Sequence, residues 1–329
     1  MSIVINIENW DSCKKSVFVT TWDDFCIDSW KKLTDYANKN NIPLTFFINT
    51  CGYCEAGKFQ KDNNYITQET KMSKENIIFL KQLVKKGNEI GYHTTEHTDM
   101  RNMSIQEMEK DFKKWISIME TNNLIDRKKG ITLAYPYGYI PKNIELIKKY
   151  FLGARSTNYG LNEINPSNIY KMKSINIGKM TTIEKLTLAV DKAIEEEKII
   201  IESGHGINQE CWSPIKQEII FKHFDYVSKK KQLWCTTFIN LIKYIIQRQN
   251  IEIILKKMNY EEIKFNIKNK IKFNFETIPL TVSFQINGNK KIKGCYQNKK
   301  ELKLNKINNL YFIKTKDFNN IITVRYNNI

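Results

Sequence analysis

Two short segments of this chain contain residue types that could bind and use a metal ion. Only 4 of the 329 residues are His, and two of them, His93 and His97, stand four positions apart. Neutral imidazole is a common metal ligand, and on a helical turn this spacing would point both rings the same way. Asp23 and Asp24 follow the apolar run Val17–Thr20. Adjacent carboxylates repel each other, which costs free energy. This cost is offset where one carboxylate binds a cation, and the other can then act as a base that takes up protons. Because two imidazoles rarely hold a catalytic metal without a further ligand, the two segments together favour one metal site.

Alternating strand and helix patterns fill the chain from about residue 17 to residue 245. Short β-rich runs predict strands at 17–24, 44–48, 89–92, 131–135, 198–202 and 234–237. Helical spacing of apolar residues predicts helices at 77–86, 103–119, 183–197 and 238–249. Ser104 and Glu107 have the spacing of a capping box at the start of the second helix. Strand, loop and helix in repetition predict a parallel sheet covered by helices, either a barrel or a doubly wound sheet.

The candidate chemical groups share one position in this pattern, since each stands where a predicted strand ends. They are Asp23, Asp24, His93, Pro136, Tyr137 and His205. In parallel α/β folds, functional residues collect at the carboxyl ends of the strands. We therefore expect these side chains to meet in a single site.

The pattern changes at about residue 251. Apolar and polar residues alternate at period two in 261–267, 272–275, 280–286, 310–313 and 321–326, and Asn287-Gly288 is a hairpin signal. This tail predicts a small antiparallel β-sandwich, which we take as an accessory domain over 251–329 after a catalytic domain over 1–250. The tail contains too few catalytic residue types for a second enzyme.

Composition limits the partners and the location that we expect. The net charge of +17 suggests attraction to polyanions, but Lys is spread along the whole chain and no nucleic-acid motif accompanies it. We therefore expect no nucleic-acid partner. The N-terminus lacks a signal-peptide pattern and no apolar run reaches about 18 residues, so the sequence predicts a soluble, cytoplasmic chain without a membrane span. Seven cysteines without regular spacing fit a reducing compartment better than a disulfide framework.

Over about residues 17–248, the chain resembles the polysaccharide deacetylases, the NodB homology domain of carbohydrate esterase family four. Thr21-Trp22-Asp23-Asp24 is similar to the first family motif, with Trp in place of Phe. The segment His93–His97 is similar to the second motif, His-Ser/Thr-x-x-His. Ala134–Gly138 is similar to the third motif, and Ser203-Gly204-His205 stands where the family has Leu-x-His.

The resemblance implies a distorted (β/α) barrel that binds a divalent cation, usually Zn2+, with Co2+, Mn2+ or Ni2+ as alternatives. It implies that the metal ligands are Asp24, His93 and His97, and that Asp23 is the general base. It also implies that the backbone N–H of Tyr137 donates to the oxyanion and that His205 protonates the departing amine. Three protein ligands would leave positions open for water and the acetyl oxygen, as a catalytic zinc requires.

Two positions depart from the family pattern. The third motif usually begins with an Arg that orients the base, and this chain has Ala134 there. Arg155 could supply the missing charge, although it could also be an ordinary surface or core-edge arginine. Ser203 replaces a Leu that helps to form the pocket for the acetyl methyl group, so the acyl-group preference stays open. The fourth family motif, which supplies the partners of the acid histidine, is not identified in this sequence.

Other interpretations of the same residues remain. The segment His93–His97 also spells His-x-x-Glu-His, the inverzincin protease pattern, in which Glu96 would be the base on a long helix. An Asp with two His also matches the facial triad of iron(II) oxygenases. Cys51 and Cys54 form a CxxC pair, which could serve a redox or second metal site, although the polar stretch after it favours a loop. His223 is predicted to be a helix-surface or core residue.

The function predicted from the sequence is metal-dependent removal of N-acetyl groups from amino-sugar units of a glycan or oligosaccharide, with release of acetate. A carbohydrate is therefore the expected partner, and the oligomeric state stays open. Two alternatives are a related barrel enzyme that hydrolyses a non-sugar C–N bond and an inactive carbohydrate-binding descendant.

Overall fold

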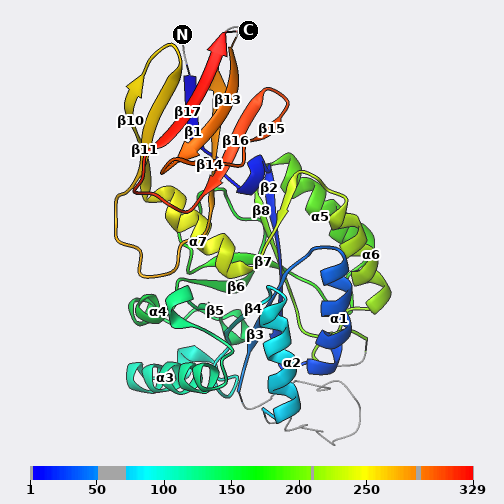
Figure 1. Ribbon diagram of the computed structural model, residues 1–329. Helices are drawn as coiled ribbons and strands as arrows, with labels where there is room; N and C mark the ends of the chain where they lie inside the picture. Colours follow the sequence, from blue (N-terminus) through cyan, green and yellow to red (C-terminus); the bar gives the residue numbers. More distant parts are fainter. Residues whose placement is uncertain (1–2, 51–71, 209–210, 287–289, 329) are drawn as a thin grey trace, which may run out of the picture. The chain divides into compact units, whose positions relative to one another are not determined.

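A computed structural model describes residues 3–50, 72–208, 211–286 and 290–328 (Figure 1). The chain divides into two compact units, Ser16–Ile242 and Met1–Lys15 together with Lys243–Ile329. The predicted boundary at residue 250 lies eight residues after the observed one at Ile242. The assignment of a catalytic and an accessory domain stays a prediction. The predicted CxxC pair at Cys51 and Cys54 and the hairpin signal at Asn287-Gly288 lie outside the described residues.

In the described part of the first unit, seven parallel strands close into a barrel, because the first of them, β2, pairs with both β3 and β8. A further strand, β9, pairs with β2 outside the ring. The strands are β2 (Ser16–Asp24), β3 (Leu44–Ile48), β4 (Glu89–Tyr92), β5 (Thr132–Ala134), β6 (Gly153–Tyr159), β7 (Met172–Asn176), β8 (Ile199–Gly204) and β9 (Leu233–Cys235). The predicted (β/α) barrel is therefore confirmed over a doubly wound sheet.

The barrel is distorted where strand pairing is sparse. Strands β4 and β5 share only the pair Tyr92–Leu133, and the pairing of β6 with β7 shifts between Arg155 and Tyr159. The more regular strands are β2 and β3, which are buried along their whole length. Strand β2 ends in Asp23 and Asp24, as the sequence predicted, so both acids belong to the strand.

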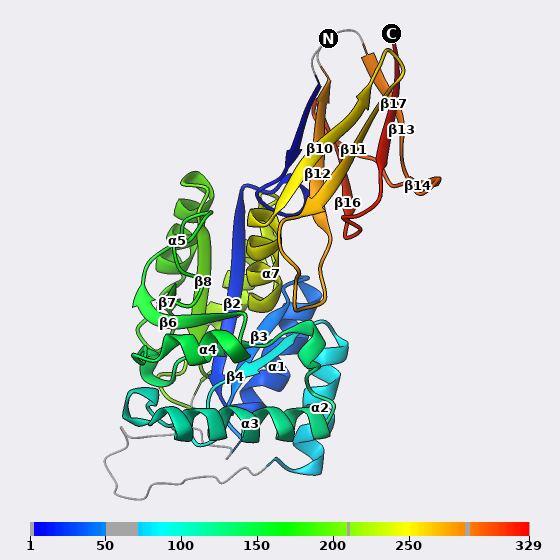
Figure 2. The ribbon, with the colours of Figure 1, turned by 90° about the vertical axis from the view of Figure 1, so that its left-hand side faces the viewer.

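Helices surround the strands of this unit (Figures 1 and 2). They are α1 (Ile27–Lys39), α2 (Lys74–Lys85), α3 (Ile105–Thr121), α4 (Ile144–Tyr150), α5 (Ile183–Glu195) and α6 (Gln217–Ser228), while α7 (Phe238–Gln249) runs through the boundary between the units. Short 3-10 turns are η1 (Asp11–Cys13), η2 (Met100–Asn102), η3 (Arg127–Lys129) and η4 (Pro136–Gly138). Helix α3 shows how these helices are specified: Phe112, Trp115 and Met119 form a buried face at helical spacing. The predicted capping box of Ser104 and Glu107 is confirmed at its start.

The second unit contains two antiparallel sheets within the described residues. One has the order β1 (Ile3–Ile7), β12 (Leu280–Ile286), β16 (Leu310–Thr315) and β15 (Asn305–Ile307). The other has the order β10 (Ile251–Met258), β11 (Glu262–Asn269), β17 (Ile322–Asn328), β13 (Lys290–Gln297) and β14 (Lys300–Leu302). The rings of Phe265 and Phe284, one from each sheet, lie 5.8 Å apart between their centroids. The predicted all-β sandwich is confirmed.

The sandwich differs from its prediction in two places. Its first sheet includes β1 from the N-terminus, which pairs with β12. The alternating burial of Ile3–Ile7 is that of a strand with one buried face. The predicted strand over 272–275 was wrong, because these residues have no paired strand and belong to the connection from β11 to β12.

The cysteine prediction was also wrong. Cys26 and Cys211 form a disulfide, with Cα atoms 6.1 Å apart, that joins the segment after β2 to the loop after β8. The two residues are 185 positions apart, so no local spacing in the sequence could reveal the pair. The cysteine count therefore does not support a reducing compartment. Among the helices in the described ranges, we find no segment with the length and apolar character needed to cross a bilayer.

Candidate metal and catalytic site

Strand β2 delivers two buried carboxylates to the same cavity. In a regular strand, successive side chains point to opposite faces. Asp24 has a φ of +74°, a left-handed conformation that is uncommon for a residue other than glycine. This local turn at the strand end explains why Asp23 and Asp24 both line one cavity.

The two histidines of the second motif follow β4 in a loop. The helical turn suggested by their spacing is absent: Thr94 and His97 have φ values of +61° and +53°, and no helix includes them. Asp111 of α3 anchors this loop by accepting a hydrogen bond from the backbone N–H of Thr95 at 3.1 Å. The loop brings the rings of His93 and His97 to a centroid distance of 4.9 Å.

Asp24, His93 and His97 form a buried group that could hold a metal ion, since their ligand atoms all lie within 4.8 Å of one another. Asp24 Oδ1 lies 3.2 Å from His97 Nε2 and 3.7 Å from His93 Nε2. The group unites one oxygen and two nitrogen donors, which is a ligand set typical of zinc.

The hydrogen bonding of His93 tests whether this group fits a cation. Its Nδ1 lies 2.8 Å from the backbone oxygen of Ala134. A carbonyl oxygen can only accept, so Nδ1 carries the hydrogen and Nε2 presents its lone pair towards Asp24. Burial lowers the pKa of His93, which favours this neutral form. A lone pair facing a carboxylate is unfavourable unless a cation lies between them, so the donor set fits a metal ion.

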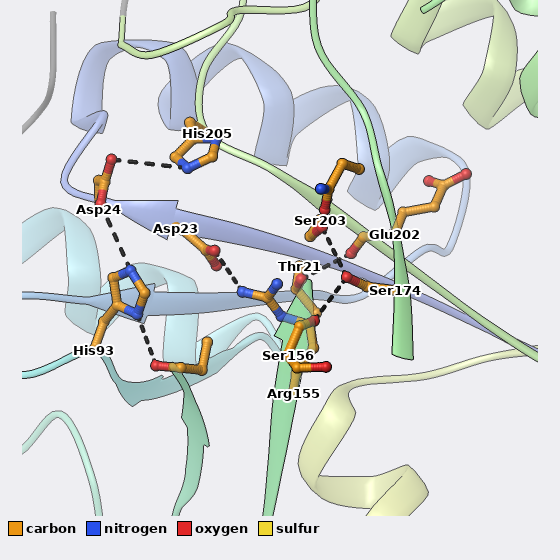
Figure 3. Close-up of polar contacts among 12 residues, drawn as sticks. Thr21, Asp23, Asp24, His93, Arg155, Ser156, Ser174, Glu202, Ser203 and His205 are labelled. Carbon is orange, nitrogen blue, oxygen red and sulfur yellow. Dashed lines mark hydrogen bonds and ion pairs between the residues drawn. The ribbon is translucent and has the colours of Figure 1, made fainter. Parts of the chain in front are cut away.

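Asp23 is paired with a buried arginine (Figure 3). Arg155 Nη2 donates to Asp23 Oδ2, and both side chains are buried. Burial raises the pKa of Asp23, but the positive charge of Arg155 and of the nearby histidines outweighs it, so the net shift is downward. Asp23 Oδ1 lacks a hydrogen-bond partner within the described residues. Arg155 thus holds the carboxylate through Oδ2, and Oδ1 is available to accept a hydrogen bond from a ligand.

The position of Arg155 explains how it reaches Asp23. Ala134 on β5 and Arg155 on β6 are register partners in adjacent parallel strands. The family pattern has its arginine at the position of Ala134 on β5. In this chain the arginine stands directly beside that position, on the neighbouring strand β6. The ring of Phe47 packs 5.4 Å from the guanidinium carbon. The structure brings Arg155 to the site, while its role stays a prediction.

Tyr137 lies in the tight turn η4 after β5. Its φ and ψ are 59° and 4°, and Gly138 follows with a φ of +75°. A Cβ on Gly138 would lie 1.8 Å from Thr157 Oγ1, so only glycine fits there. The Tyr137 ring packs edge-on against His97 at a centroid distance of 4.6 Å, and the residue lines the cavity.

His205 follows β8, and Asp24 lies between it and His93 (Figure 3). Its Nε2 lies 3.9 Å from Asp24 Oδ2, and its backbone oxygen accepts a hydrogen bond from Trp30 Nε1 at 2.9 Å. The His205 ring packs edge-on against Trp212 at 5.1 Å. Sequence reasoning missed Trp212, which no recognised motif marks and which stands next to the disulfide cysteine Cys211.

These residues surround one cavity of about 520 Å³. Ser203, the residue that replaces the family leucine, is buried beside it and donates to Asn176 Oδ1 at 2.6 Å. Ser174 Oγ lies 3.0 Å from Ser203 Oγ (Figure 3). This part of the cavity therefore has a polar lining instead of an aliphatic one.

The fourth histidine lies apart from the cavity. His223 on α6 is fully buried, and its Nε2 lies 2.7 Å from Glu202 Oε1. Glu202 precedes Ser203 on β8, so in this strand its side chain lies on the opposite face. The prediction of His223 as a core residue is confirmed.

The protease interpretation of the segment His93–His97 was wrong. It requires a helix, and the segment is a loop in which the side chain of Glu96 is largely exposed and pairs with Lys114 at 3.4 Å. The iron(II) oxygenase interpretation requires a β fold without alternating helices, whereas helices alternate with the strands of this barrel.

Comparisons with known proteins found one family profile and several solved structures that are similar to this chain. Residues 11–152 match the family profile described as polysaccharide deacetylase. A structure described as a polysaccharide deacetylase from Mycobacterium smegmatis aligns with a TM-score of 0.51 at 10% identity, covering 73% of this chain and 93% of the other. A cobalt complex of a family 4 acetyl xylan esterase from Clostridium thermocellum aligns with a TM-score of 0.47 at 15% identity, covering 68% and 89%. A family 4 carbohydrate esterase from Bacillus subtilis aligns with a TM-score of 0.44 at 13% identity, covering 70% and 82%. No curated protein matches this chain.

The fold and the site define a (β/α) barrel protein with a buried Asp–His–His group at the carboxyl ends of its strands. The matched profile indicates the family that this class resembles: residues 11–152 match the polysaccharide deacetylases. The resemblance predicted from the sequence motifs is confirmed.

Proposed function

We propose that this protein is a metal-dependent N-deacetylase that hydrolyses acetamido groups of N-acetylated amino sugars in a glycan or oligosaccharide. The observation that supports the proposal most directly is the buried group of Asp24, His93 and His97 with Asp23 beside it. Hydrolysis of an amide needs an electrophile, a base for water and an acid for the amine. The residues around this cavity can fill all three roles.

Asp24 Oδ1 and the Nε2 atoms of His93 and His97 would hold the cation, for which Zn2+ is the first candidate and Co2+, Mn2+ or Ni2+ are alternatives. When bound, the cation supplies polarisation of the acetyl carbonyl and a lower pKa for its bound water. The hydrogen bond from His93 Nδ1 to the Ala134 oxygen orients that ring towards Asp24.

Asp23 is the proposed general base. Its lowered pKa keeps the carboxylate ionised at neutral pH, and its unpartnered Oδ1 can accept a proton from the attacking water. Arg155 is the proposed positioning residue, since its hydrogen bond to Oδ2 fixes the carboxylate while leaving Oδ1 available. This contact also favours an active enzyme over an inactive descendant, because the charge missing at Ala134 is present at Arg155.

The other two roles belong to Tyr137 and His205. We assign the backbone N–H of Tyr137 as a donor to the oxyanion of the tetrahedral intermediate, since the left-handed turn η4 fixes the backbone at the cavity wall. His205 is the proposed acid that protonates the departing amine. It is partly exposed in the cavity, and the edge of Trp212 limits the orientations of its ring.

Acetate release from N-acetylglucosamine oligomers tests the proposal. We expect release by the purified protein, loss of release after treatment with a chelator, and recovery on addition of Zn2+. Absence of release from N-acetylated sugars, together with hydrolysis of a non-sugar amide or ureide, would contradict the proposal in favour of a related barrel amidohydrolase. Absence of any hydrolysis with intact sugar binding would favour the inactive descendant.

A further inference from the structure

A second cavity, of about 640 Å³, adjoins the candidate site and is not used by the proposed chemistry. We name it the α5 cavity. Its lining includes Tyr159, Met180, Lys185, Leu188 and Lys192. The lining residues come from β6, β7 and α5 and from the segments that connect these elements, which lie beside β8 in Figure 2.

The α5 cavity and the candidate site are neighbours that share lining residues. Asn176, Met180 and Thr181 line both cavities. A substrate unit that extends from the reacting sugar at this side would therefore lie next to the α5 cavity. This adjacency argues that the occupant is part of the same substrate molecule.

The rim of the α5 cavity exposes large side chains that a surface usually keeps covered. Tyr159, Met180 and Leu188 are 79%, 82% and 70% exposed. Clustered exposed apolar side chains mark binding sites. Because they are so exposed, they form an open rim and not the enclosed channel that a long lipid chain would need. An open aromatic and aliphatic rim suits the apolar C–H face of a sugar ring.

The charged side chains that line the α5 cavity are all positive. Its charged lining residues are Lys185 and Lys192, and no carboxylate lines it within the described part of the chain. Lys192 lies 3.7 Å from Glu196, whereas Lys185 has no ion pair with any residue in the described ranges. A cavity lined by two lysines favours an anionic occupant.

Asn176 places a hydrogen-bond donor where the two cavities share lining residues. Asn176 Oδ1 accepts the hydrogen bond from Ser203, so its Nδ2 hydrogens can donate to a ligand. Thr181 Oγ1 accepts from the backbone N–H of Gly178 at 2.9 Å, which fixes the side chain at the junction. A glycosidic or hydroxyl oxygen could accept the hydrogen bond from Asn176.

We propose that the α5 cavity binds the unit next to the reacting amino sugar, and that this unit is an acidic sugar. The substrate class is then an oligosaccharide or polysaccharide in which N-acetylated amino sugars neighbour units with a carboxylate or another anionic group. This inference rests on the proposed function for the identity of the reacting sugar. Its binding test, however, does not depend on turnover.

Calorimetric binding of two probes of equal length tests the proposal. One is a tetrasaccharide of alternating N-acetylglucosamine and glucuronic acid, and the other is neutral chitotetraose. We expect wild type to prefer the acidic probe, with a preference that weakens at high salt. Lys185→Gln with Lys192→Gln should weaken acidic-probe binding by about fivefold to tenfold and change chitotetraose binding by less than about twofold. Tyr159→Ala should weaken the binding of both probes.

The matched control is Lys110→Gln, an exposed lysine on α3 that lines neither cavity and should change neither affinity. Equal affinity of wild type for both probes, or a double variant that keeps the wild-type preference, would overturn the proposal. Failure to bind the acidic probe, combined with Lys185-dependent binding of dodecyl phosphate, would overturn it in favour of an amphiphilic ligand. If the acidic probe binds as expected but no acetate is released from it, the α5 cavity assignment stands and the proposed function fails.

Discussion

The two compact units place different chemistry in their interiors. Among the described residues, the buried histidines and the buried carboxylates all belong to the unit Ser16–Ile242. In the other unit, the buried polar side chains include hydroxyls and amides that bond to each other, such as Thr315 Oγ1, which donates to Gln297 Oε1 at 3.0 Å. Buried ionisable groups cost free energy unless they are paired or bind an ion. The comparison separates a unit with several buried carboxylates and histidines from a unit in which packing and neutral hydrogen bonds predominate, with Lys243 as its one buried charged residue among those described.

The largest effect on activity is expected from His97→Ala, which removes one of the three proposed metal ligands. We expect metal content to fall from one equivalent to a small fraction and kcat/KM to fall by about 1,000-fold or more, because the cation supplies several kcal/mol of transition-state stabilisation. Elemental analysis of the purified variant, with kinetics at saturating Zn2+, measures both. A variant that keeps its metal and its rate would remove His97 from the site.

Asp23→Asn should separate the base from the metal ligands. The amide has nearly the same shape but cannot accept the proton, so kcat should fall by about 100-fold to 10,000-fold. Metal content should stay at the wild-type level, because Asp24 and the two histidines are unchanged. If turnover stays at the wild-type level, the assignment of Asp23 as base fails.

Arg155→Ala should lower kcat by about 10-fold to 100-fold, as is typical for residues that orient an active-site group. Because it also leaves Asp23 buried without its partner, we expect a loss of stability of about 3–5 kcal/mol. The double variant Ala134→Arg with Arg155→Ala moves the guanidinium from β6 to the paired position on β5, where the family pattern has its arginine. Partial recovery of kcat with unchanged KM would identify a positioning role. Recovery of stability without recovery of kcat would indicate a structural role only.

Breaking the disulfide should affect stability more than chemistry. Cys26→Ser should lower the free energy of unfolding by about 2–5 kcal/mol, because the bond closes a long loop. It should lower kcat only modestly, through looser positioning of Trp212 against His205. Denaturant unfolding with and without a reductant measures the first effect. Equal stability of the oxidised and reduced protein would show that the bond does not support the fold.

A core substitution in the second unit should have the smallest effect on the reaction. Phe284→Ala removes a buried ring that packs on Phe265, and we expect a loss of about 3–5 kcal/mol from the stability of that unit. The kcat for a short N-acetylated oligosaccharide and the metal content should be unchanged at a temperature where the protein is folded. A loss of bound metal in the folded variant would contradict the separation between the units.

The candidate site residues were predictable because their positions follow from local rules. Asp24, His93, Tyr137 and His205 each stand at the end of a strand whose apolar pattern is visible in the sequence, and parallel strands bring such ends together. Helix α3 could be located from its cap for the same reason. Periodicity and caps depend only on neighbouring residues, so a single sequence contains enough information for them.

The features that the sequence could not reveal depend on contacts between distant residues. The pairing of Cys26 with Cys211, of β1 with β12, and of Arg155 with Asp23 all join segments that leave no local signature. Arg155 could only be suggested as a candidate, because strand register decides whether its side chain reaches Asp23. The segment 272–275 shows the opposite error, since an alternating pattern without a partner strand does not form a strand.

Anomalous diffraction from crystals grown with Zn2+ tests the central claim most directly. We predict one strong peak, about 2.0–2.2 Å from Asp24 Oδ1, His93 Nε2 and His97 Nε2. A zinc peak at other residues with these three side chains unliganded, or zinc-saturated crystals with no peak beside Asp24, would contradict the account.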